Sequence, residues 1–492
     1  MSGCEDWDLD CTTVPYTGRK GAKSRAPFAG VDGEGGDYYS NGGHEYLLLR
    51  AGERVLETGA PLTLVECLTF LADLPKGIVY VSFFFDYDVT MMLRSMPEER
   101  LKRLLDPSMR RKNPCSPAYP IDYGDFQIDY MPHKEFRVRR RGKKTQWTII
   151  NDTGSFFQEA FAKVLGDGTI GGALPKWLGD RAEYRQIIQG IAEGKGKRAE
   201  FGPMTDYERE YNRHECELLA EMMTLYREMC DRLDLRPNKW QGPGQLVTAF
   251  FKREKFPRHS DLAIYDEKPE FILFANDAFY GGRFEDCIFG WIPGPVHQWD
   301  INSAYASVYH KLPCLVHSRW EQRKLLPSYA KKPLFVADVQ FRHPKGWAVN
   351  TLPIRTDKGT LIFPREGRGI YWSTEIDAAR RHGVEIELIG DCWECISTCD
   401  CQPFQRVQEL YAERQRLGSS TQGRPLKLML ATLYGKFAQT VGCAPFASPV
   451  WAGLITSHTR ALLVDAAHAT DNGGADVVML ATDGLYTLED RP

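Results

Sequence analysis

The chain has 492 residues, of which 43% are hydrophobic and 26% are charged, and its formal net charge is -3. This composition predicts a soluble globular protein of two to four domains, since no apolar run reaches the ~20 residues that a membrane-spanning helix needs. The charge gives no global basic excess of the kind that indicates nucleic-acid binding, so any basic surface must be local, as in residues 137–144, 195–198 and 406–436. For residues 137–144 a solvated hairpin tip is an equally good interpretation.

No secretory signal precedes residue 16, and the thirteen cysteines lack the pattern of a small secreted disulfide framework. We therefore expect reduced thiols, a cytoplasmic location and no membrane association.

The first half of the chain alternates predicted strands and helices after a polar, irregular segment at residues 1–26. Apolar and β-branched runs predict strands at 28–32, 46–49 and 78–85. Helical periodicity predicts helices at 89–96, 155–165 and 207–233. This alternation is typical of an α/β domain.

Four acids and a phenol in this half suit two-metal hydrolysis of a phosphodiester. Asp32 and Glu34 lie two apart on an extended chain, so they face the same side. A strand-to-helix junction adds Asp88 or, as the alternative, Asp86. On a helix Tyr211 and Glu215 lie four apart and share a face. Tyr211 is expected to orient the attacking water. Taken singly, Asp32-Gly33-Glu34 is also compatible with an ordinary turn, and the Tyr211 segment with a plain amphipathic helix.

The second half begins after a turn-rich stretch at 266–284. Strands are predicted near 297, at 333–342 and at 385–389, and helices at 373–382, 402–417, 424–440 and 455–467. Residues 477–486 are predicted to form a hairpin around Thr482-Asp483-Gly484.

Asp300 and Asp483 are the candidate metal ligands of this half, because magnesium needs only one or two carboxylates beside substrate phosphates. Lys427 and Tyr434 share one face of the intervening helix with Ala431. Lys427 is expected to meet triphosphate oxygens, with Arg414 and Arg416 as further phosphate contacts. Tyr305 is expected to stack under the incoming sugar, and Tyr434 with Gly435 to pack against the new base pair. A lone aspartate in a turn is usually only a turn residue, but the ordered set is harder to explain that way.

These segments resemble motifs A, B and C of family B DNA polymerases, and most closely those of the protein-primed branch of bacteriophages and linear plasmids. DINSAY at 300–305 resembles motif A, and KLMLATLYGKF at 427–437 resembles motif B. LATDG at 480–484 resembles motif C, with Ala481 in place of the first aspartate. Tyr280-Gly281-Gly282 resembles the linker that passes the primer between two active sites. Residues 455–460 match a further helix of the family.

The acids of the first half resemble the three motifs of the proofreading 3'-5' exonuclease in the same family. Asp32 and Glu34 match the first motif and Asp88 the second, while Glu215 stands where the third motif usually has aspartate. Phe156 and Phe157 are candidate stacking platforms for a frayed single strand, with plain core packing as the alternative.

The resemblance implies a ribonuclease H-like α/β exonuclease domain, an α+β palm and helical fingers, in a right-hand architecture lacking the thumb. The thumb is expected to be absent because the chain stops nine residues after Asp483, and the hairpin insertion between residues 437 and 451 is expected to be absent or vestigial. The expected boundaries are an N-terminal segment at 1–26, the exonuclease domain at 27–265, a linker at 266–296, the palm at 297–400, the fingers at 401–441 and the palm continuation at 442–492.

The implied function is a DNA-directed DNA polymerase with proofreading that replicates phage, plasmid or other mobile-element DNA. Its expected cofactors are two Mg2+ ions per active site, with Mn2+ as a substitute, and its partners are template-primer DNA, dNTPs and a terminal-protein primer. The alternatives are a protein active mainly as a 3'-5' exonuclease and a non-catalytic DNA-binding remnant.

Cys392, Cys395, Cys399 and Cys401 form a compact run that could hold zinc. The first pair falls in a predicted strand, whose alternation would turn neighbouring side chains to opposite faces. We therefore expect scattered reduced thiols and no zinc.

Overall fold

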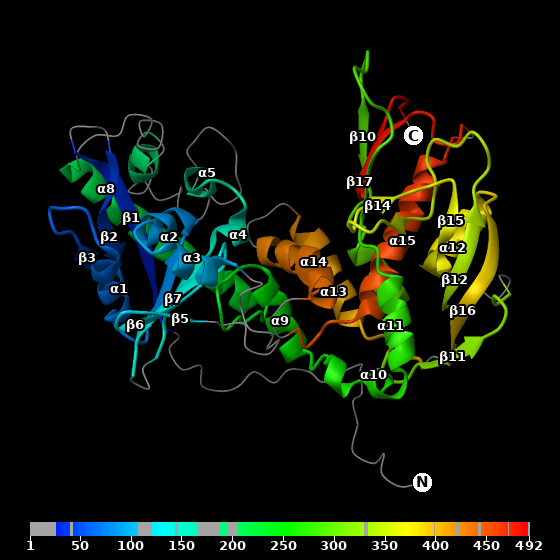
Figure 1. Ribbon diagram of the computed structural model, residues 1–492, viewed down its shortest axis with the longest axis horizontal. Coiled ribbons are helices and arrows are strands. Elements are labelled where there is room, and N and C mark those ends of the chain that lie inside the picture. Colours follow the sequence, from blue (N-terminus) through cyan, green and yellow to red (C-terminus); the bar gives the residue numbers. More distant parts are fainter. Residues whose placement is uncertain are drawn as a thin grey trace, which may run out of the picture.

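The computed structural model describes most of the chain (Figure 1). The described residues are 26–39, 43–106, 120–142, 146–165, 186–191, 193, 204–328, 333–397, 399–418, 423–440, 444–470 and 472–490. The basic segment 195–198 and part of 137–144 lie outside them.

An eight-stranded sheet forms the first half of the molecule, at the blue end of the chain in Figure 1. Its order is β3-β2-β1-β4-β8-β7-β6-β5, in which β1, β4 and β8 are parallel to one another and β2 and β7 are antiparallel to their neighbours. The strands are β1 Phe28–Tyr39, β2 Gly43–Ala51, β3 Arg54–Leu56, β4 Val79–Ser82, β5 Ile121–Tyr123, β6 Phe126–Met131, β7 Glu135–Arg140 and β8 Thr148–Asp152.

Helices cover this sheet: α1 Leu64–Ala72, α2 Asp86–Leu93, α3 Glu98–Leu105, α4 Gly154–Phe157, α5 Phe161–Leu165 and α8 Asp206–Arg232. Helix α8 begins at a capping box in which Thr205 and Glu208 exchange hydrogen bonds. It lies very close to β1, since a Cβ on Gly30 would come within 2.3 Å of the backbone oxygen of Cys216. Only glycine permits this approach, which brings the middle of α8 to the acids of β1.

The helix predicted at 155–165 is two short helices. Gln158 ends α4 with a φ of 58°, in the left-handed region that interrupts a helix. The long helix predicted at 207–233 is confirmed as α8.

The second half of the chain contains two four-stranded sheets, with helices α12 and α15 packed near them. One sheet has the order β10-β18-β17-β9, and the other β11-β16-β12-β15. The elements are β9 Arg283–Asp286, β10 His297–Asp300, β11 Arg319–Arg323, β12 Phe335–Arg342, β15 Glu366–Trp372, β16 Glu385–Ser397, β17 Val477–Thr482, β18 Gly484–Thr487, α12 Ser373–Arg381 and α15 Pro449–Ala467. A short ribbon of β13 Ile354–Arg355 and β14 Leu361–Ile362 flanks them. The hairpin predicted at 477–486 is confirmed as β17 and β18.

Further helices lie between the two sheet systems (Figure 1). They are α9 Gly244–Arg253, η2 His259–Asp261, α10 Ile264–Glu267, α11 Pro269–Asp277, η3 Ala306–Lys311, α13 Gln405–Leu417 and α14 Arg424–Phe437. The expectation of a turn-rich stretch at 266–284 is wrong for its first half, because Pro269 opens α11 at a position where its missing N–H costs nothing. In the connection from α14 to α15, the residues that the structure describes contain no strand.

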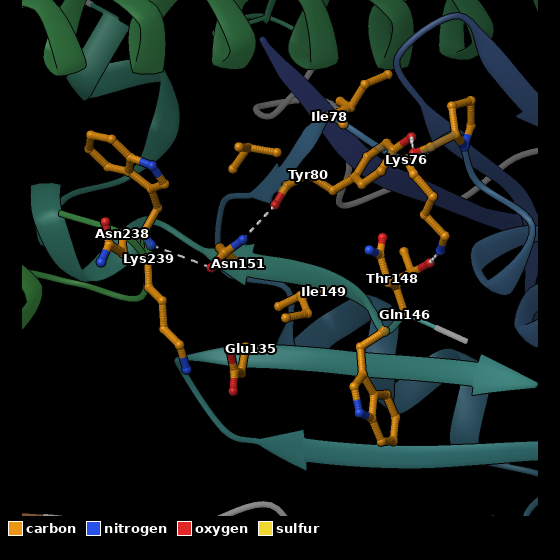
Figure 2. Close-up of a pocket in the computed structure, with 15 residues that line it drawn as sticks. Lys76, Ile78, Tyr80, Glu135, Gln146, Thr148, Ile149, Asn151, Asn238 and Lys239 are labelled. Carbon is orange, nitrogen blue, oxygen red and sulfur yellow. Dashed lines mark hydrogen bonds between the residues drawn. The ribbon is translucent and has the colours of Figure 1, made fainter. Parts of the chain in front are cut away.

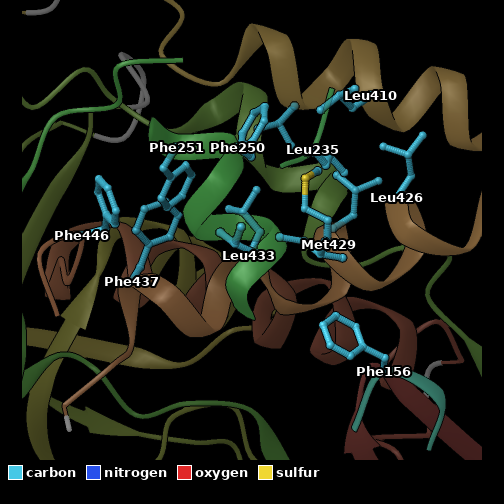
Figure 3. Close-up of a cluster of buried hydrophobic side chains, with 14 of the residues drawn as sticks. Phe156, Leu235, Phe250, Phe251, Leu410, Leu426, Met429, Leu433, Phe437 and Phe446 are labelled. Carbon is cyan, nitrogen blue, oxygen red and sulfur yellow. The ribbon is translucent and has the colours of Figure 1, made fainter. Parts of the chain in front are cut away.

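One hydrophobic core runs from the first sheet system into the helices of the second half. Helix α14 buries Leu426, Met429, Leu433 and Phe437, spaced three to four residues apart along one face. Figure 3 shows this face against Phe250 and Phe251 of α9, with Leu410 of α13 alongside. Helix α14 is therefore packed on the same core as part of the first sheet system, and Lys427, Ala431 and Gly435 on its other face are exposed.

Candidate active sites

The structure brings Asp300 and Asp483 together at the ends of adjacent strands. Asp300 is the last residue of β10, opposite Gly484 of β18 in the antiparallel register. The N–H of Ile301 donates to the backbone oxygen of Asp483 over 2.9 Å. Partial burial and the negative charge of Asp300 raise the pKa of Asp483. Two carboxylates that repel each other in this way suit a divalent cation.

The backbone beside both acids is unusual. Ser303 has a φ of 53° and Thr482 a φ of 60°, although neither is glycine. A β-branched residue such as Thr482 is strained by about 1–3 kcal/mol at a positive φ. Strain of this kind is common at functional sites. It supports the assignment of these two turns as functional.

Tyr305 and Tyr434 meet beside the paired acids. Their ring centroids are 4.8 Å apart, at an angle of 35°. Burial first, and then the charge of Asp483, raises the pKa of Tyr305. Gly282 packs beside Tyr305 and Thr482. A Cβ at this position would come within 3.4 Å of the Tyr305 hydroxyl and 3.3 Å of Thr482. Segments that are distant in sequence, including the Tyr280-Gly281-Gly282 linker, thus converge on one place.

A buried arginine, which the sequence predicted only as part of a supporting helix, holds these segments in place. Arg460 of α15 is 1% exposed and forms a two-pronged ion pair with Glu375 of α12, at 2.8 and 2.7 Å. It also donates to the backbone oxygen of Gly281, and its guanidinium lies 5.7 Å from the Tyr280 ring centre. The signal that could have identified Glu375 is weak, since it lies 85 residues away in an ordinary helix.

The predicted phosphate-binding cations have different surroundings. Lys427 is exposed on α14, and so are Ala431 and Gly435. Arg416 pairs with Glu413 of its own helix at 2.8 and 2.6 Å, and Arg414 donates to the backbone of Gly418. Their role at a triphosphate therefore stays a prediction.

The acids of the first half also gather. Asp32, Glu34 and Glu215 each offer a carboxylate oxygen, and these oxygens all lie within 4.8 Å of one another. Glu34 and Glu215 are buried. Asp32 and Glu215 line a pocket of about 130 Å³, whose other walls are Val31, Gly33, Phe83, Phe84, Tyr87, Asp88, Phe161 and Leu219.

Asp88, and not Asp86, faces this pocket. Asp88 accepts a hydrogen bond from the Tyr46 hydroxyl at 2.9 Å, and burial raises its pKa to about 7. Asp86 points elsewhere, to Tyr130 and His133. Gly33 makes the arrangement possible, since a Cβ there would collide with the Tyr46 hydroxyl at 1.9 Å.

Asn212, which the sequence analysis missed, and Tyr211 each hold one of these acids. Asn212 donates to Asp32 over 2.9 Å and accepts from Arg50 over 3.0 Å. Tyr211 donates to Glu215 over 2.7 Å, so in this arrangement the phenol holds the carboxylate. The position of Asn212, directly after Tyr211 on the same helix, was the available signal.

Phe156 and Phe157 are not stacking platforms. Both are buried, 0% and 1% exposed, in the aromatic core with Tyr226 and Trp240. The exposed aromatic walls of the pocket are Phe84 and Tyr87, each 44% exposed. Phe84 has a φ of 60°, and Asp152 fixes it by accepting the N–H groups of Phe84 and Phe85.

A larger pocket of about 250 Å³ lies elsewhere on the same sheet, between β7, β8 and the segment before α9 (Figure 2). Asn151 crosses it, donating to Tyr80 at 3.0 Å and accepting from the N–H of Trp240 at 3.4 Å. None of the four clustered acids lines this pocket. The candidate active site is therefore the smaller of these two pockets, which contains the acids.

The cysteine run at 392–401 does not form one ligand set. Cys392 is fully buried in the palm core and Cys395 lies on the same strand, β16. Cys399 and Cys401 lie beyond the end of that strand. None of the nine described cysteines is in a disulfide.

The chain belongs to a family of known polymerases. The family described as DNA polymerase type B, organellar and viral, matches residues 191–442, just over half of the chain. The matched range includes residues 300–305 and 427–437 and ends before Asp483.

Two comparisons with individual proteins agree with this membership. The Primer-independent DNA polymerase PolB of Escherichia coli is 25% identical over 264 residues, which are 48% of this chain and 30% of that protein. Phi29 DNA polymerase in an orthorhombic crystal form superposes with a TM-score of 0.61 at 13% identity, over 95% of this chain and 81% of that one. Its complex with primer-template DNA and incoming nucleotides gives a TM-score of 0.59 at 12% identity, over 96% and 81%.

These matches show the fold. The chain has a mixed arrangement of sheets and helices that is consistent with the polymerase architecture of these structures. Within the described residues, every helix is too short or too polar to cross a lipid bilayer.

Proposed function

We propose that the protein is a DNA-directed DNA polymerase whose nucleotidyl-transfer site is centred on Asp300 and Asp483. The observation that carries the proposal is the adjacency of these two acids beside Tyr305 and Tyr434. Mg2+, or Mn2+ in its place, would be held by the two carboxylates and would neutralise charge developing on the transferred phosphate.

The remaining roles rest on the resemblance, on the exposed position of Lys427 on α14 and on the place of Tyr305 and Tyr434 beside the acids. Lys427, with Arg414 or Arg416, contacts the triphosphate of the incoming dNTP. Tyr305 packs under its sugar, and Tyr434 with Gly435 packs against the new base pair. The 3'-hydroxyl of the primer then attacks the α-phosphate, and pyrophosphate leaves.

We further propose a 3'-5' proofreading exonuclease at Asp32, Glu34, Asp88 and Glu215. The clustering of three of these carboxylates, and the location of Asp88 in the same pocket, support it. Hard oxygen donors of this kind suit Mg2+. Phe84 and Tyr87 replace Phe156 and Phe157 as the candidates that stack on a frayed strand, and Tyr280-Gly281-Gly282 guides the strand between the sites.

The proposed boundaries are those expected from sequence: exonuclease domain 27–265, linker 266–296, palm 297–400, fingers 401–441 and palm continuation 442–492. One hydrophobic core contains residues of both halves of the chain, so the proposed exonuclease and fingers regions pack against each other. The proposed setting is replication of mobile-element DNA in the host cytoplasm.

Initiation has two candidates. The resemblance to the protein-primed branch favours a terminal-protein primer. The name of the Escherichia coli relative favours a start without a primer. A circular single-stranded template with dNTPs, and neither primer nor protein partner, tests the second: products formed in that reaction support it, and their absence leaves the terminal protein as the proposal.

Primer extension with Mg2+ tests the activity itself. Wild-type protein is expected to extend a 5'-labelled primer on template DNA, and Asp483→Asn to reduce the rate at least ~100-fold. Label released from the 3' end without extension would support the exonuclease-only alternative, and DNA binding with neither activity would support the remnant.

A further inference from the structure

Four metal-binding side chains meet at the base of the fingers, away from both acid clusters. Cys314 and His317 lie in the connection between η3 and β11, while Cys399 and Cys401 lie between β16 and α13. Each offers one donor atom, and all four atoms lie within 4.8 Å of one another. The two pairs are therefore brought together by the fold, from loops some 80 residues apart.

The measured separations match those around a tetrahedral zinc ion. With Zn–S of about 2.3 Å and Zn–N of about 2.0–2.1 Å, the sulfur-to-nitrogen distance in a tetrahedron is about 3.6 Å. The Sγ of Cys314 is 3.6 Å from the Nδ1 of His317, and the Sγ of Cys401 is 3.4 Å from the same nitrogen.

Hydrogen bonding among the four groups explains this geometry less well. The Nδ1 atom carries either one proton or one lone pair, so it can pair fully with only one of the two sulfurs. Thiols are also weak donors. A cation at the centre of the four atoms satisfies every donor at once.

We propose that Cys314, His317, Cys399 and Cys401 form a structural zinc site. Three thiolates and an imidazole select zinc over magnesium or calcium, which prefer oxygen ligands. Four protein ligands leave no open position for a reacting water, so the ion's role is structural.

The location of the four residues indicates which parts of the chain a bound zinc ion would connect. Cys314 and His317 follow the motif A turn through η3, and Cys401 precedes α13, which packs against η3. The ion would tie the chain after Asp300 to the first helix of the fingers. The inference does not depend on the proposed catalytic activity.

Metal analysis of the full chain tests the site. Protein purified from zinc-supplemented medium and dialysed against a weak chelator is expected to keep about one zinc per molecule. Cys401→Ser and His317→Ala are each expected to lower this content at least several-fold. Cys395→Ser, which alters a neighbouring cysteine outside the set, is the matched control and is expected to keep the zinc.

Cobalt substitution gives a second readout that does not require a variant to fold well. Wild-type protein loaded with Co2+ is expected to show a thiolate-to-metal charge-transfer band, and zinc is expected to displace it. Wild-type protein without bound zinc and without this band would overturn the proposal, as would a zinc content that Cys401→Ser leaves unchanged. Loss of two free thiols with no metal would instead indicate a disulfide, and it would also overturn the proposal.

Discussion

At the scale of single residues, the ionisation of Asp88 depends strongly on the fold. Burial raises its pKa to about 7, and the charge of Glu215 adds to the effect. Hydrogen bonds from Tyr46 and from the backbone of Gly33 act in the opposite direction and are outweighed. Without a metal, the folded chain therefore holds a proton here that an unfolded chain releases near pH 3.8.

This difference predicts a stability effect with a definite sign. Between pH 4 and 7 the folded state binds more protons than the unfolded state, so the free energy of unfolding falls as pH rises through that window. In chelator at pH 8, Asp88→Asn is expected to stabilise the folded chain by about 1–4 kcal/mol, because the amide keeps the hydrogen bond from Tyr46 without the charge.

Thermal melting at pH 5 and pH 8 measures the effect. The gain should be small at pH 5, and Mg2+ should reduce it at pH 8 by stabilising the wild-type protein. Asp86→Asn is the control, since its carboxylate pairs with the exposed His133. An equal gain at both pH values would contradict the account.

The ion pair of Arg460 and Glu375 is the second prediction for single residues. Glu375→Gln leaves a fully buried guanidinium without its counter-charge, and the expected loss is about 3–5 kcal/mol in chemical denaturation. Asp465→Asn breaks an exposed pair between the same two helices, at 2.7 Å from Arg381, and should cost no more than about 1 kcal/mol. Equal losses in the two variants would refute the buried pair's special role.

At the scale of elements, the junction between α9 and α14 depends on stacked aromatic rings. Phe251 is fully buried, with its ring 4.5 Å from Phe256 and 5.4 Å from Phe437. Phe251→Ala is expected to cost about 3–5 kcal/mol. Phe289→Ala removes a ring that is 82% exposed and should change the unfolding free energy by less than about 0.5 kcal/mol. Denaturant titration of the two variants decides whether this junction is a stabilising core.

Sequence predicted those elements and residues whose signal is local. The long periodic helix α8, the hairpin of β17 and β18 and the spacing of Asp32 and Glu34 can each be recognised within a few residues. The Asp300–Asp483 pair was predicted because each acid sits in a short motif, and the sheet register then brings them together.

Features that depend on distant parts of the chain were not predicted. Phe156 and Phe157 are close in sequence to Phe161, which lines the pocket. Packing against Tyr226 and Trp240 nevertheless buries both rings. The cysteine run holds only two of the four clustered side chains, because the other two, Cys314 and His317, come from a distant loop. The ion pair of Arg460 and Glu375 forms only because α15 packs on α12.

At the scale of the whole molecule, two acid clusters occupy two halves joined by one core. This arrangement predicts that the two proposed activities can be removed one at a time, since no described ion pair links the clusters. Shared packing also predicts that unfolding one half weakens the other, so variants must be shown to fold before their activities are compared.

The most direct test is a crossed experiment on one 5'-labelled primer annealed to a longer template, with Mg2+ and with or without dNTPs. Asp483→Asn is expected to lose extension while still shortening the primer, and Asp32→Ala to lose shortening while still extending it. Extension that survives in Asp483→Asn, or a single substitution that removes both activities from a well-folded protein, would contradict the assignment of polymerisation to the Asp300–Asp483 pair.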